Sequence, residues 1–272
     1  MDFPCHDCIV SVENLSVPLV RELLEYQHDM TYVLLNLQRF QEAMLKFAEQ
    51  DVLTHYLSNL EQIYLNKLTS DKRKREWLGG RFAAKYVAAG MLARNQNAVP
   101  WLKLAVIADK NGRPFLAPDK KEGDLPDISI SHSGELAAAM AVSKGLCGID
   151  IQKVTGRVFK VRDRFCTPSE AHLLSFYCER SAAQSSSLTM LWAAKEALRK
   201  VANQSPLPGF LELELTEILE MPAGKIPTSW KLIFAWKHRG INGNPFVEKC
   251  SVAVCLIADY VLALTVRNAT ND

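Results

Sequence analysis

The sequence predicts an α+β fold built as a pseudo-twofold repeat of two similar subdomains, each with helices packed on one face of a mainly antiparallel sheet. Residues 41–93 contain no proline and place apolar residues at helical spacing. Asn111 and Gly112 lie between two short apolar stretches, which is a strong signal for a β-hairpin. Apolar stretches separated by turn residues near the C-terminus are typical of successive strands. These three observations together indicate the fold class.

The repeat is visible in paired signals for the start of a helix. Ser58 precedes Glu61 by three residues and Thr167 precedes Glu170 by the same interval, and both pairs are typical of a capping box. Each signal is followed by a longer helical segment that carries residues at intervals of four. We expect the register of the repeat to match two sets of residues, which are Trp77, Arg81 and Lys85 in the first half and Trp192, Glu196 and Lys200 in the second.

These elements divide the chain into three parts. Residues 1–30 form an N-terminal extension, residues 31–144 the N-terminal subdomain and residues 145–272 the C-terminal subdomain. The expected strands of the N-terminal subdomain are 31–37, 102–107, 114–116, 128–133 and 136–143, around the helical block. The expected elements of the C-terminal subdomain are strands 148–152, 210–215, 230–236, 250–257 and 261–266 and helices 167–177 and 188–203.

Composition narrows the class of protein. The formal net charge of +2 argues against a nucleic-acid-binding protein with a basic surface. The seven cysteines follow no disulfide framework and indicate reduced thiols. The N-terminus does not resemble a signal peptide, and no apolar stretch is long enough to span a bilayer. We therefore expect a cytoplasmic protein without nucleic-acid or membrane partners.

One pair of cysteines invites a different interpretation. Cys5 and Cys8 have a spacing that suits two zinc ligands. A second pair is needed for a structural site, and Cys250 and Cys255 are poorly spaced for it. We favour structural or incidental thiols over a zinc site.

The chemistry is concentrated in one helix and one strand. Residues 191–200 have helix-forming composition, and Glu196 and Lys200 share a helix face at i and i+4. Residues 148–152 alternate as a strand, so Asp150 and Gln152 point to one side and the neighbouring isoleucines to the other. A strand carboxylate and amide facing a helix carboxylate and ammonium group suit Mg²⁺ and a phosphate.

Two motifs in these segments carry a family resemblance. They are Gly148-Ile149-Asp150-Ile151 and, about forty residues later, Trp192-x-x-Lys195-Glu196-Ala197-x-x-Lys200. The chain resembles the 4′-phosphopantetheinyl transferases, in the larger two-lobed form similar to the surfactin-synthetase activator. The resemblance covers roughly residues 31–266 and implies that the active site lies at the interface of the two subdomains.

The resemblance implies that coenzyme A is the substrate and that polar and cationic side chains meet its phosphates. The expected coenzyme A ligands are Arg81, Lys110, Arg113, Ser131, His132, Asp150, Lys195 and Lys200. Taken alone, His132 would be interpreted as a satisfied structural histidine. Within Ile130-Ser131-His132-Ser133, which resembles the Ser-His-Ser element of the family, phosphate contact is favoured.

The resemblance also implies a metal site. Asp150 and Glu196 match the family's ligands for Mg²⁺, with Mn²⁺ as an alternative ion. Gln152 stands where a third acidic residue is often found, and it would offer its carbonyl oxygen or position a water molecule. Taken singly, Asp150 is interpreted as a strand-end acid and Glu196 as a partner of Lys200 on the helix surface. The coincidence of the two motifs reverses that preference.

The implied reaction is transfer of the 4′-phosphopantetheine group from coenzyme A to a serine hydroxyl of an acyl or peptidyl carrier protein, with adenosine 3′,5′-bisphosphate as the second product. The expected catalytic residues are Glu196, as general base, with Asp150 and Lys200. Residues 154–165 mix basic and apolar side chains, which suits an acidic carrier helix and a solvated helix face equally well. The two-half symmetry suggests a monomer.

Two other classes of function compete with this hypothesis. One is a non-catalytic coenzyme A or carrier-binding protein of the same fold, with Gln152 as a mark of lost activity. The other is a different Mg²⁺-dependent nucleotide enzyme, which the absence of a glycine-rich phosphate loop weakens. Binding of coenzyme A without transfer would identify the first, and a preference for ATP would identify the second.

Overall fold

A computed structural model describes residues 6–12, 15–46, 49–94, 99–118, 125–181, 184–202, 206–220, 229–239 and 245–268. The chain forms two compact units. Unit 1 comprises residues 1–11, 27–147 and 268–272, and unit 2 comprises residues 12–26 and 148–267. The first thirty residues therefore contribute to both units. No helix within the described ranges is both long enough and apolar enough to cross a membrane.

Unit 1 contains an antiparallel sheet with the strand order β1-β2-β6-β5 and a separate hairpin of β3 and β4. The strands are β1 Ile9–Val10, β2 Met30–Asn36, β3 Leu104–Ala108, β4 Pro114–Pro118, β5 Asp127–Ser133 and β6 Leu136–Val142. The helices are η1 His6–Cys8, α2 Leu37–Lys46, α3 Glu49–Tyr56, α4 Asn59–Lys67, α5 Asp71–Arg94 and η2 Trp101–Lys103.

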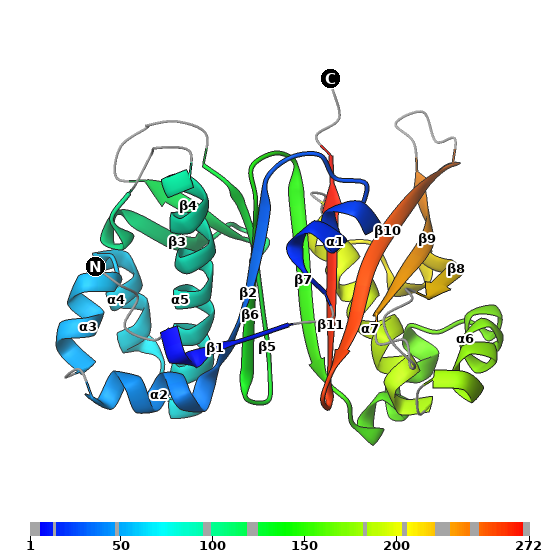
Figure 1. The fold of residues 1–272 in the computed structure, drawn as a ribbon, viewed down its shortest axis with the longest axis horizontal. Helices are drawn as coiled ribbons and strands as arrows, with labels where there is room; N and C mark the ends of the chain where they lie inside the picture. The colour runs from blue at the N-terminus through cyan, green and yellow to red at the C-terminus, as the bar shows by residue number, and fades with distance from the viewer. Residues whose placement is uncertain are drawn as a thin grey trace. The chain divides into compact units, whose positions relative to one another are not determined.

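The long helix α5 lies along the sheet of unit 1 (Figure 1), where it packs on β6, β2 and β5. Its alanine-rich segment allows close approach, because Ala83, Ala84 and Ala88 are fully buried. Gly79 gives room to the start of α2, since a Cβ there would come within 2.2 Å of Leu37 Cδ2. Small residues of α5 thus let the helix lie close to the sheet and to α2, despite the helix propensity that glycine costs.

Unit 2 contains an antiparallel sheet with the strand order β7-β11-β10-β9-β8. Its strands are β7 Leu146–Lys153, β8 Leu213–Glu220, β9 Ser229–Arg239, β10 Pro245–Ile257 and β11 Tyr260–Arg267, of which β7 begins in unit 1. Its helices are α1 Val17–Leu23, η3 Gly156–Arg164, α6 Pro168–Ser181, α7 Gln184–Lys200 and η4 Phe210–Glu212. The α+β class predicted from the sequence is confirmed.

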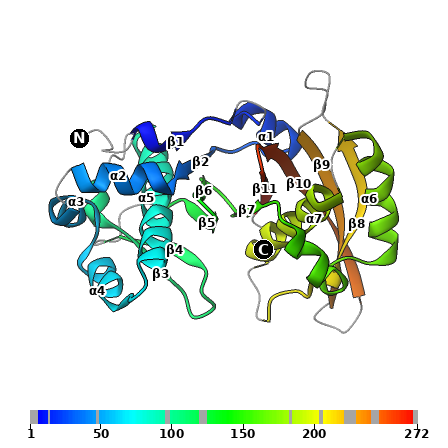
Figure 2. The same ribbon diagram turned by 90° about the horizontal axis from the view of Figure 1, so that it is seen from below.

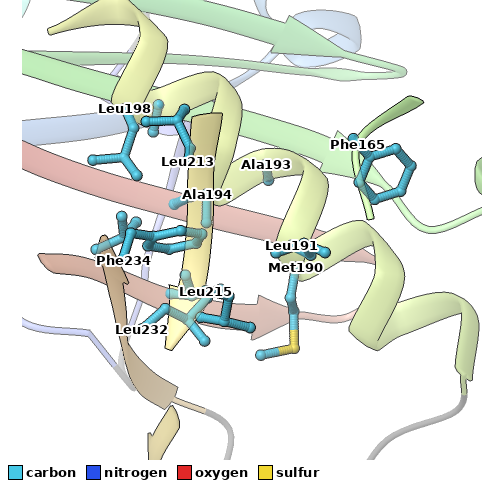
Figure 3. Packing of buried hydrophobic residues seen from close by; sticks show 14 of the residues in the cluster. Phe165, Met190, Leu191, Ala193, Ala194, Leu198, Leu213, Leu215, Leu232 and Phe234 are labelled. Carbon is cyan, nitrogen blue, oxygen red and sulfur yellow. The ribbon is translucent and has the colours of Figure 1, made fainter. Parts of the chain in front are cut away.

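Helix α7 covers one face of this sheet, as Figure 2 shows from below, and packs on β11 and β10. Its buried side chains interlock with those of β8 and β9 (Figure 3). Leu191, Ala194 and Leu198 follow the helical repeat and are fully buried, as are Leu213 and Phe234 on the strands. This face of α7 is therefore committed to the core, which leaves its other side for polar chemistry.

Each unit holds its helices to its strands with a buried ion pair. In unit 1, Lys85 Nζ lies 2.6 Å from Glu61 Oε2, and both side chains are buried. Glu61 also caps α4 through Ser58 and accepts a hydrogen bond from the backbone N–H of Val106 at 3.1 Å. Lys85 donates further to the carbonyl oxygen of Tyr56 at 2.6 Å. One carboxylate thus joins a helix start, a strand and a second helix.

Unit 2 repeats this arrangement. Lys195 Nζ lies 2.7 Å from Glu170 Oε1, with both side chains fully buried. Glu170 accepts hydrogen bonds from the backbone N–H groups of Thr167 and Leu215, each at 2.8 Å. Lys195 donates to the carbonyl oxygen of Phe165 at 2.7 Å. The internal repeat is therefore a repeat of hydrogen-bonding chemistry as well as of capping signals.

The ion pairs correct the expected register of the repeat. Lys85 corresponds to Lys195, so Phe82-Ala83-Ala84-Lys85 aligns with Trp192-Ala193-Ala194-Lys195. The expected matching of Trp77 with Trp192 and of Lys85 with Lys200 is wrong. The equal spacing of tryptophan and cationic residues in the two helices does not mark equivalent positions. Lys85 and Lys195 are equivalent because each forms a buried ion pair with a glutamate.

We expect Lys195→Met to lower the free energy of unfolding by about 3 kcal/mol, because it leaves the Glu170 carboxylate buried without its counter-ion. Urea denaturation measures this loss. Lys72→Met is the control: its ion pair with Glu76 spans 3.8 Å and the Lys72 side chain is 72% exposed, so the change should stay under about 1 kcal/mol. Equal effects of the two substitutions would contradict the structural role of Lys195.

Candidate functional site

Strand β7 places Asp150 beside helix α7 by means of a glycine. A Cβ atom on Gly148 would lie 2.1 Å from the carbonyl oxygen of Ala197, so only glycine permits this approach of strand and helix. Two residues along the strand, Asp150 points to the same face as Gly148. Its side chain is 4% exposed. Ile149 and Ile151 are fully buried, as the strand alternation predicts.

Helix α7 brings Lys200 to this strand. Lys200 Nζ lies 2.9 Å from Asp150 Oδ1 and donates a hydrogen bond to the carbonyl oxygen of Ile149 at 2.6 Å. The Lys200 side chain is 27% exposed, so it is only partly withdrawn from solvent. The predicted proximity of Asp150 and Lys200, fifty residues apart, is therefore present.

Glu196 lies one helical turn before Lys200 on α7. Burial raises the pKa of its carboxyl group, and the negative charge of Asp150 raises it further, while Arg199 and Lys200 oppose the shift. Arg199 forms an ion pair with Glu196 at 3.5 Å. Two acids and two cations thus share one corner of unit 2.

Gln152 contacts the same carboxylate. Its amide nitrogen Nε2 donates a hydrogen bond to Asp150 Oδ2 at 3.0 Å. Asp150 therefore has one oxygen oriented by the neighbouring amide and the other paired with Lys200. This contact assigns the amide nitrogen of Gln152 to Asp150 and leaves a metal-ligating role for its carbonyl oxygen as a prediction.

Lys195 is the one predicted coenzyme A ligand that the structure removes from the set. Its side chain is fully buried and its ammonium group contacts Glu170 and the carbonyl oxygen of Phe165. Burial lowers the pKa of this lysine, against the raising effect of Glu170. Lys195 and Glu196 are adjacent in sequence, so their side chains leave the helix about 100° apart and meet different surroundings. Lys195 serves the scaffold.

The remaining predicted ligands belong to unit 1, and one of them is the partly buried Arg81 on α5. Its guanidinium carbon lies 4.6 Å from the centre of the Trp77 ring, which in turn stacks on Tyr64. Burial lowers the pKa of Arg81, and the nearby Glu61 opposes this. Its Nε atom is buried and has no hydrogen-bond partner among the residues that the structure describes. A buried donor of this kind suits an anion.

The β3–β4 hairpin carries the next two cations. Lys110 is exposed in the turn, where Asp109 Oδ1 accepts hydrogen bonds from the backbone N–H groups of Asn111 and Arg113. Gly112 has a φ of 85°, which explains the glycine. The Arg113 guanidinium group pairs with Asp127 at 2.5 Å and also contacts the carbonyl oxygen of Cys147. Arg113 thus anchors the hairpin to β5.

Ser131 and His132 lie near the end of β5. Ser131 is buried, whereas the His132 side chain is 46% exposed. His132 Nδ1 lies 3.9 Å from Glu76 Oε2 on α5, a separation that allows a weak ion pair when the imidazole is protonated. The exposed edge of His132 is available to an anion.

Several contributors were not predicted from the sequence. Gly148 sets the strand-to-helix distance, Arg199 pairs with Glu196, and Asp127 holds Arg113. Asp127 also accepts a hydrogen bond from the backbone N–H of Cys147 at 2.8 Å. No motif marks Asp127 or Arg199. The sequence does contain one signal for the strand-to-helix packing, which is the glycine of the Gly148-Ile149-Asp150-Ile151 motif.

The metal-ligand inventory is limited. Across the residues that the structure describes, no group of three or more His, Cys, Asp or Glu side chains is placed to hold a metal ion. The pair Asp150 and Glu196 falls below that number. Cys5, half of the pair considered for zinc, lies outside the described residues.

Part of this chain is similar to known proteins, and the segment matched by a family model lies mainly in unit 2. The model of the 4′-phosphopantetheinyl transferase superfamily matches residues 146–264. A holo-[acyl-carrier-protein] synthase of Bacillus pumilus is 30% identical over 118 residues, which are 43% of this chain and 87% of that protein. The 4′-phosphopantetheinyl transferase B, mitochondrial, of Aspergillus fumigatus is 28% identical over 149 residues, 50% of this chain and 93% of that protein.

A solved structure was also found. It is the crystal structure of a holo-(acyl-carrier-protein) synthase from Bacillus anthracis in complex with CoA (3′,5′-ADP). The superposition covers 42% of this chain and 92% of the synthase chain, with 26% sequence identity and a TM-score of 0.34.

We expect Gly148→Ala to lower the free energy of unfolding by about 2–3 kcal/mol, because the new methyl group overlaps the Ala197 carbonyl oxygen and pushes β7 away from α7. Chemical denaturation gives the value. Gly156→Ala is the matched control, since a Cβ at that position meets no atom within 4 Å and should leave stability unchanged or slightly raised. A neutral Gly148→Ala would show that the strand and helix do not need this approach.

Proposed function

This chain belongs to the 4′-phosphopantetheinyl transferase superfamily, and we propose that Asp150, Glu196 and Lys200 form its catalytic cluster. The observation that supports this most directly is the contact of the β7 carboxylate with the α7 ammonium group at 2.9 Å, one helical turn from the second carboxylate, Glu196. Both family motifs thereby meet in one place.

The reaction is the transfer of 4′-phosphopantetheine from coenzyme A to a serine of a carrier protein. The serine oxygen attacks the phosphorus atom on the pantetheine side of the pyrophosphate, and the bond from that phosphorus to the bridging oxygen breaks. Adenosine 3′,5′-bisphosphate leaves with the bond electrons, and the serine proton must be accepted by a base. The products are holo carrier protein and the bisphosphate.

The chain's residues fit a divalent ion at this cluster. Asp150 and Glu196 are partly or fully withdrawn from water and repel each other, so a cation between them would be stabilised. Mg²⁺ takes one or two protein carboxylates and completes its shell with water and substrate phosphate oxygens. When bound, Mg²⁺, or Mn²⁺ in its place, would supply positive charge for the pyrophosphate. Asp150 and Glu196 would hold it.

The remaining chemistry belongs to side chains of the chain itself. Glu196 is the proposed acceptor of the serine proton, because it is the second carboxylate of the cluster and lies one helical turn from Lys200. Lys200 carries a positive charge that can move from Asp150 to a phosphate oxygen of the leaving group. Asp150 positions the Lys200 ammonium group through their contact at 2.9 Å.

Other parts of the proposal concern ligands and partners. Arg81, Lys110, Arg113, Ser131 and His132 stay predictions as ligands of the coenzyme A phosphates, supported by their charge or hydroxyl groups. The identity of the carrier protein, a monomeric state and a cytoplasmic location also stay predictions.

Intact-mass spectrometry of an apo carrier protein incubated with the chain, coenzyme A and Mg²⁺ tests the function. We expect a gain of about 340 Da, the mass of one phosphopantetheine arm. Asp150→Asn and Glu196→Gln should each slow transfer at least about a hundredfold. Asp259→Asn is the control, because this exposed carboxylate in unit 2 pairs with Lys153. A substitution in the cluster that leaves transfer intact would refute the assignment of that residue.

We expect EDTA to abolish the mass gain and added Mg²⁺ or Mn²⁺ to restore it, because two carboxylates and a pyrophosphate repel one another unless a divalent cation offsets their negative charge. The same mass measurement, with and without chelator, reports this. Transfer that continues in EDTA would contradict the metal site. Coenzyme A binding without any transfer to several carriers would favour the non-catalytic binding protein instead.

A further inference from the structure

The two acids of the cluster are paired with two different cations of α7. Lys200 Nζ contacts Asp150 Oδ1 at 2.9 Å, and Arg199 contacts Glu196 Oε1 at 3.5 Å. Any divalent ion that binds these carboxylates therefore meets oxygen atoms that already interact with positive charge. The behaviour of these two cations decides how readily an ion binds.

Arg199 is anchored where it is. Its Nε donates a hydrogen bond to the carbonyl oxygen of Pro208 at 2.9 Å, and its guanidinium carbon lies 4.4 Å from the centre of the Phe210 ring. Its contact with Glu196 is long and lies among partly exposed side chains. These contacts hold the guanidinium group whether or not Glu196 is engaged elsewhere.

Lys200 is placed differently. Its ammonium group carries a flexible four-carbon chain, reaches the carbonyl oxygen of Ile149 as well as Asp150, and is 27% exposed. Asp150 is 4% exposed, so its contact with Lys200 is less screened by water than a surface ion pair. The Gln152 amide holds the other oxygen of Asp150, so the carboxylate cannot turn freely to offer both oxygens.

Building on the proposed function, we infer that Lys200 competes with the divalent ion for Asp150 Oδ1 and thereby couples ion binding to coenzyme A binding. An ion arriving alone must displace the ammonium group toward solvent. An ion arriving with coenzyme A leaves Lys200 a pyrophosphate oxygen as its new partner. The coupling is reciprocal, so the ion also tightens coenzyme A binding. Lys200 thus disfavours occupation of the site by a metal ion without substrate.

Mn²⁺ binding measured by electron paramagnetic resonance, with no coenzyme A present, isolates this competition. We expect Lys200→Met to bind Mn²⁺ about tenfold more tightly than the unaltered chain, within the usual range of such couplings. Lys200→Arg keeps a cation in place and should stay close to the unaltered chain. Lys153→Met removes a positive charge from the same strand, but that lysine pairs with Asp259 at 3.3 Å, so it reports the general effect of charge.

A second titration adds saturating coenzyme A. In the unaltered chain coenzyme A should raise Mn²⁺ affinity about tenfold or more, and in Lys200→Met this increase should shrink. Circular dichroism and thermal melting confirm that each variant is folded. Mn²⁺ affinity that is unchanged or weaker in Lys200→Met, or raised equally by Lys153→Met, overturns the inference.

The two proposals fail in different ways. If the unaltered chain transfers phosphopantetheine and Lys200→Met gains no Mn²⁺ affinity, the inference is wrong and the proposed function stands. If the unaltered chain neither binds Mn²⁺ nor modifies a carrier, the proposed function is wrong and the inference falls with it.

Discussion

The candidate site depends on the close packing of β7 against α7. Gly148 lacks the Cβ atom that would otherwise lie 2.1 Å from the Ala197 carbonyl oxygen. With the backbones this close, a side chain two residues further on the strand reaches the last turn of the helix. Asp150 and Lys200 can then form a direct contact rather than one through water. A larger strand-to-helix separation would leave the acidic and basic groups of the two motifs unpaired.

The packing is maintained by a scaffold that uses the same chemistry twice. In each unit a buried glutamate caps one helix, accepts a strand N–H and pairs with a buried lysine of the long helix. Burying two charges is unfavourable unless hydrogen bonds satisfy them, and here backbone carbonyl and N–H groups do so. Directional contacts of this kind set the rotation of α5 and α7 about their axes more strictly than apolar packing does.

The rotation of α7 about its axis places core residues on one side of the helix and residues of the candidate site on the adjacent side. One side of the helix carries Leu191, Ala194 and Leu198 into the core (Figure 3), together with the buried ammonium group of Lys195. The adjacent side carries Glu196 and Lys200 toward β7. Each carboxylate of the cluster is paired with a cation of α7, Asp150 with Lys200 at 2.9 Å and Glu196 with Arg199 at 3.5 Å.

The sequence by itself determined the α+β class, both capping signals and most strands, and its two family motifs predicted that Asp150 and Lys200 lie near each other. Hydrophobic periodicity, turn residues and motif spacing are local properties of the sequence, so they can be recognised without the tertiary structure. Tertiary structure alone decided that Lys195 is buried, that the repeat aligns Lys85 with Lys195, and that Gln152 donates to Asp150. Adjacent helix residues differ in surroundings only through the helix rotation, and that rotation is set by buried contacts distant in sequence.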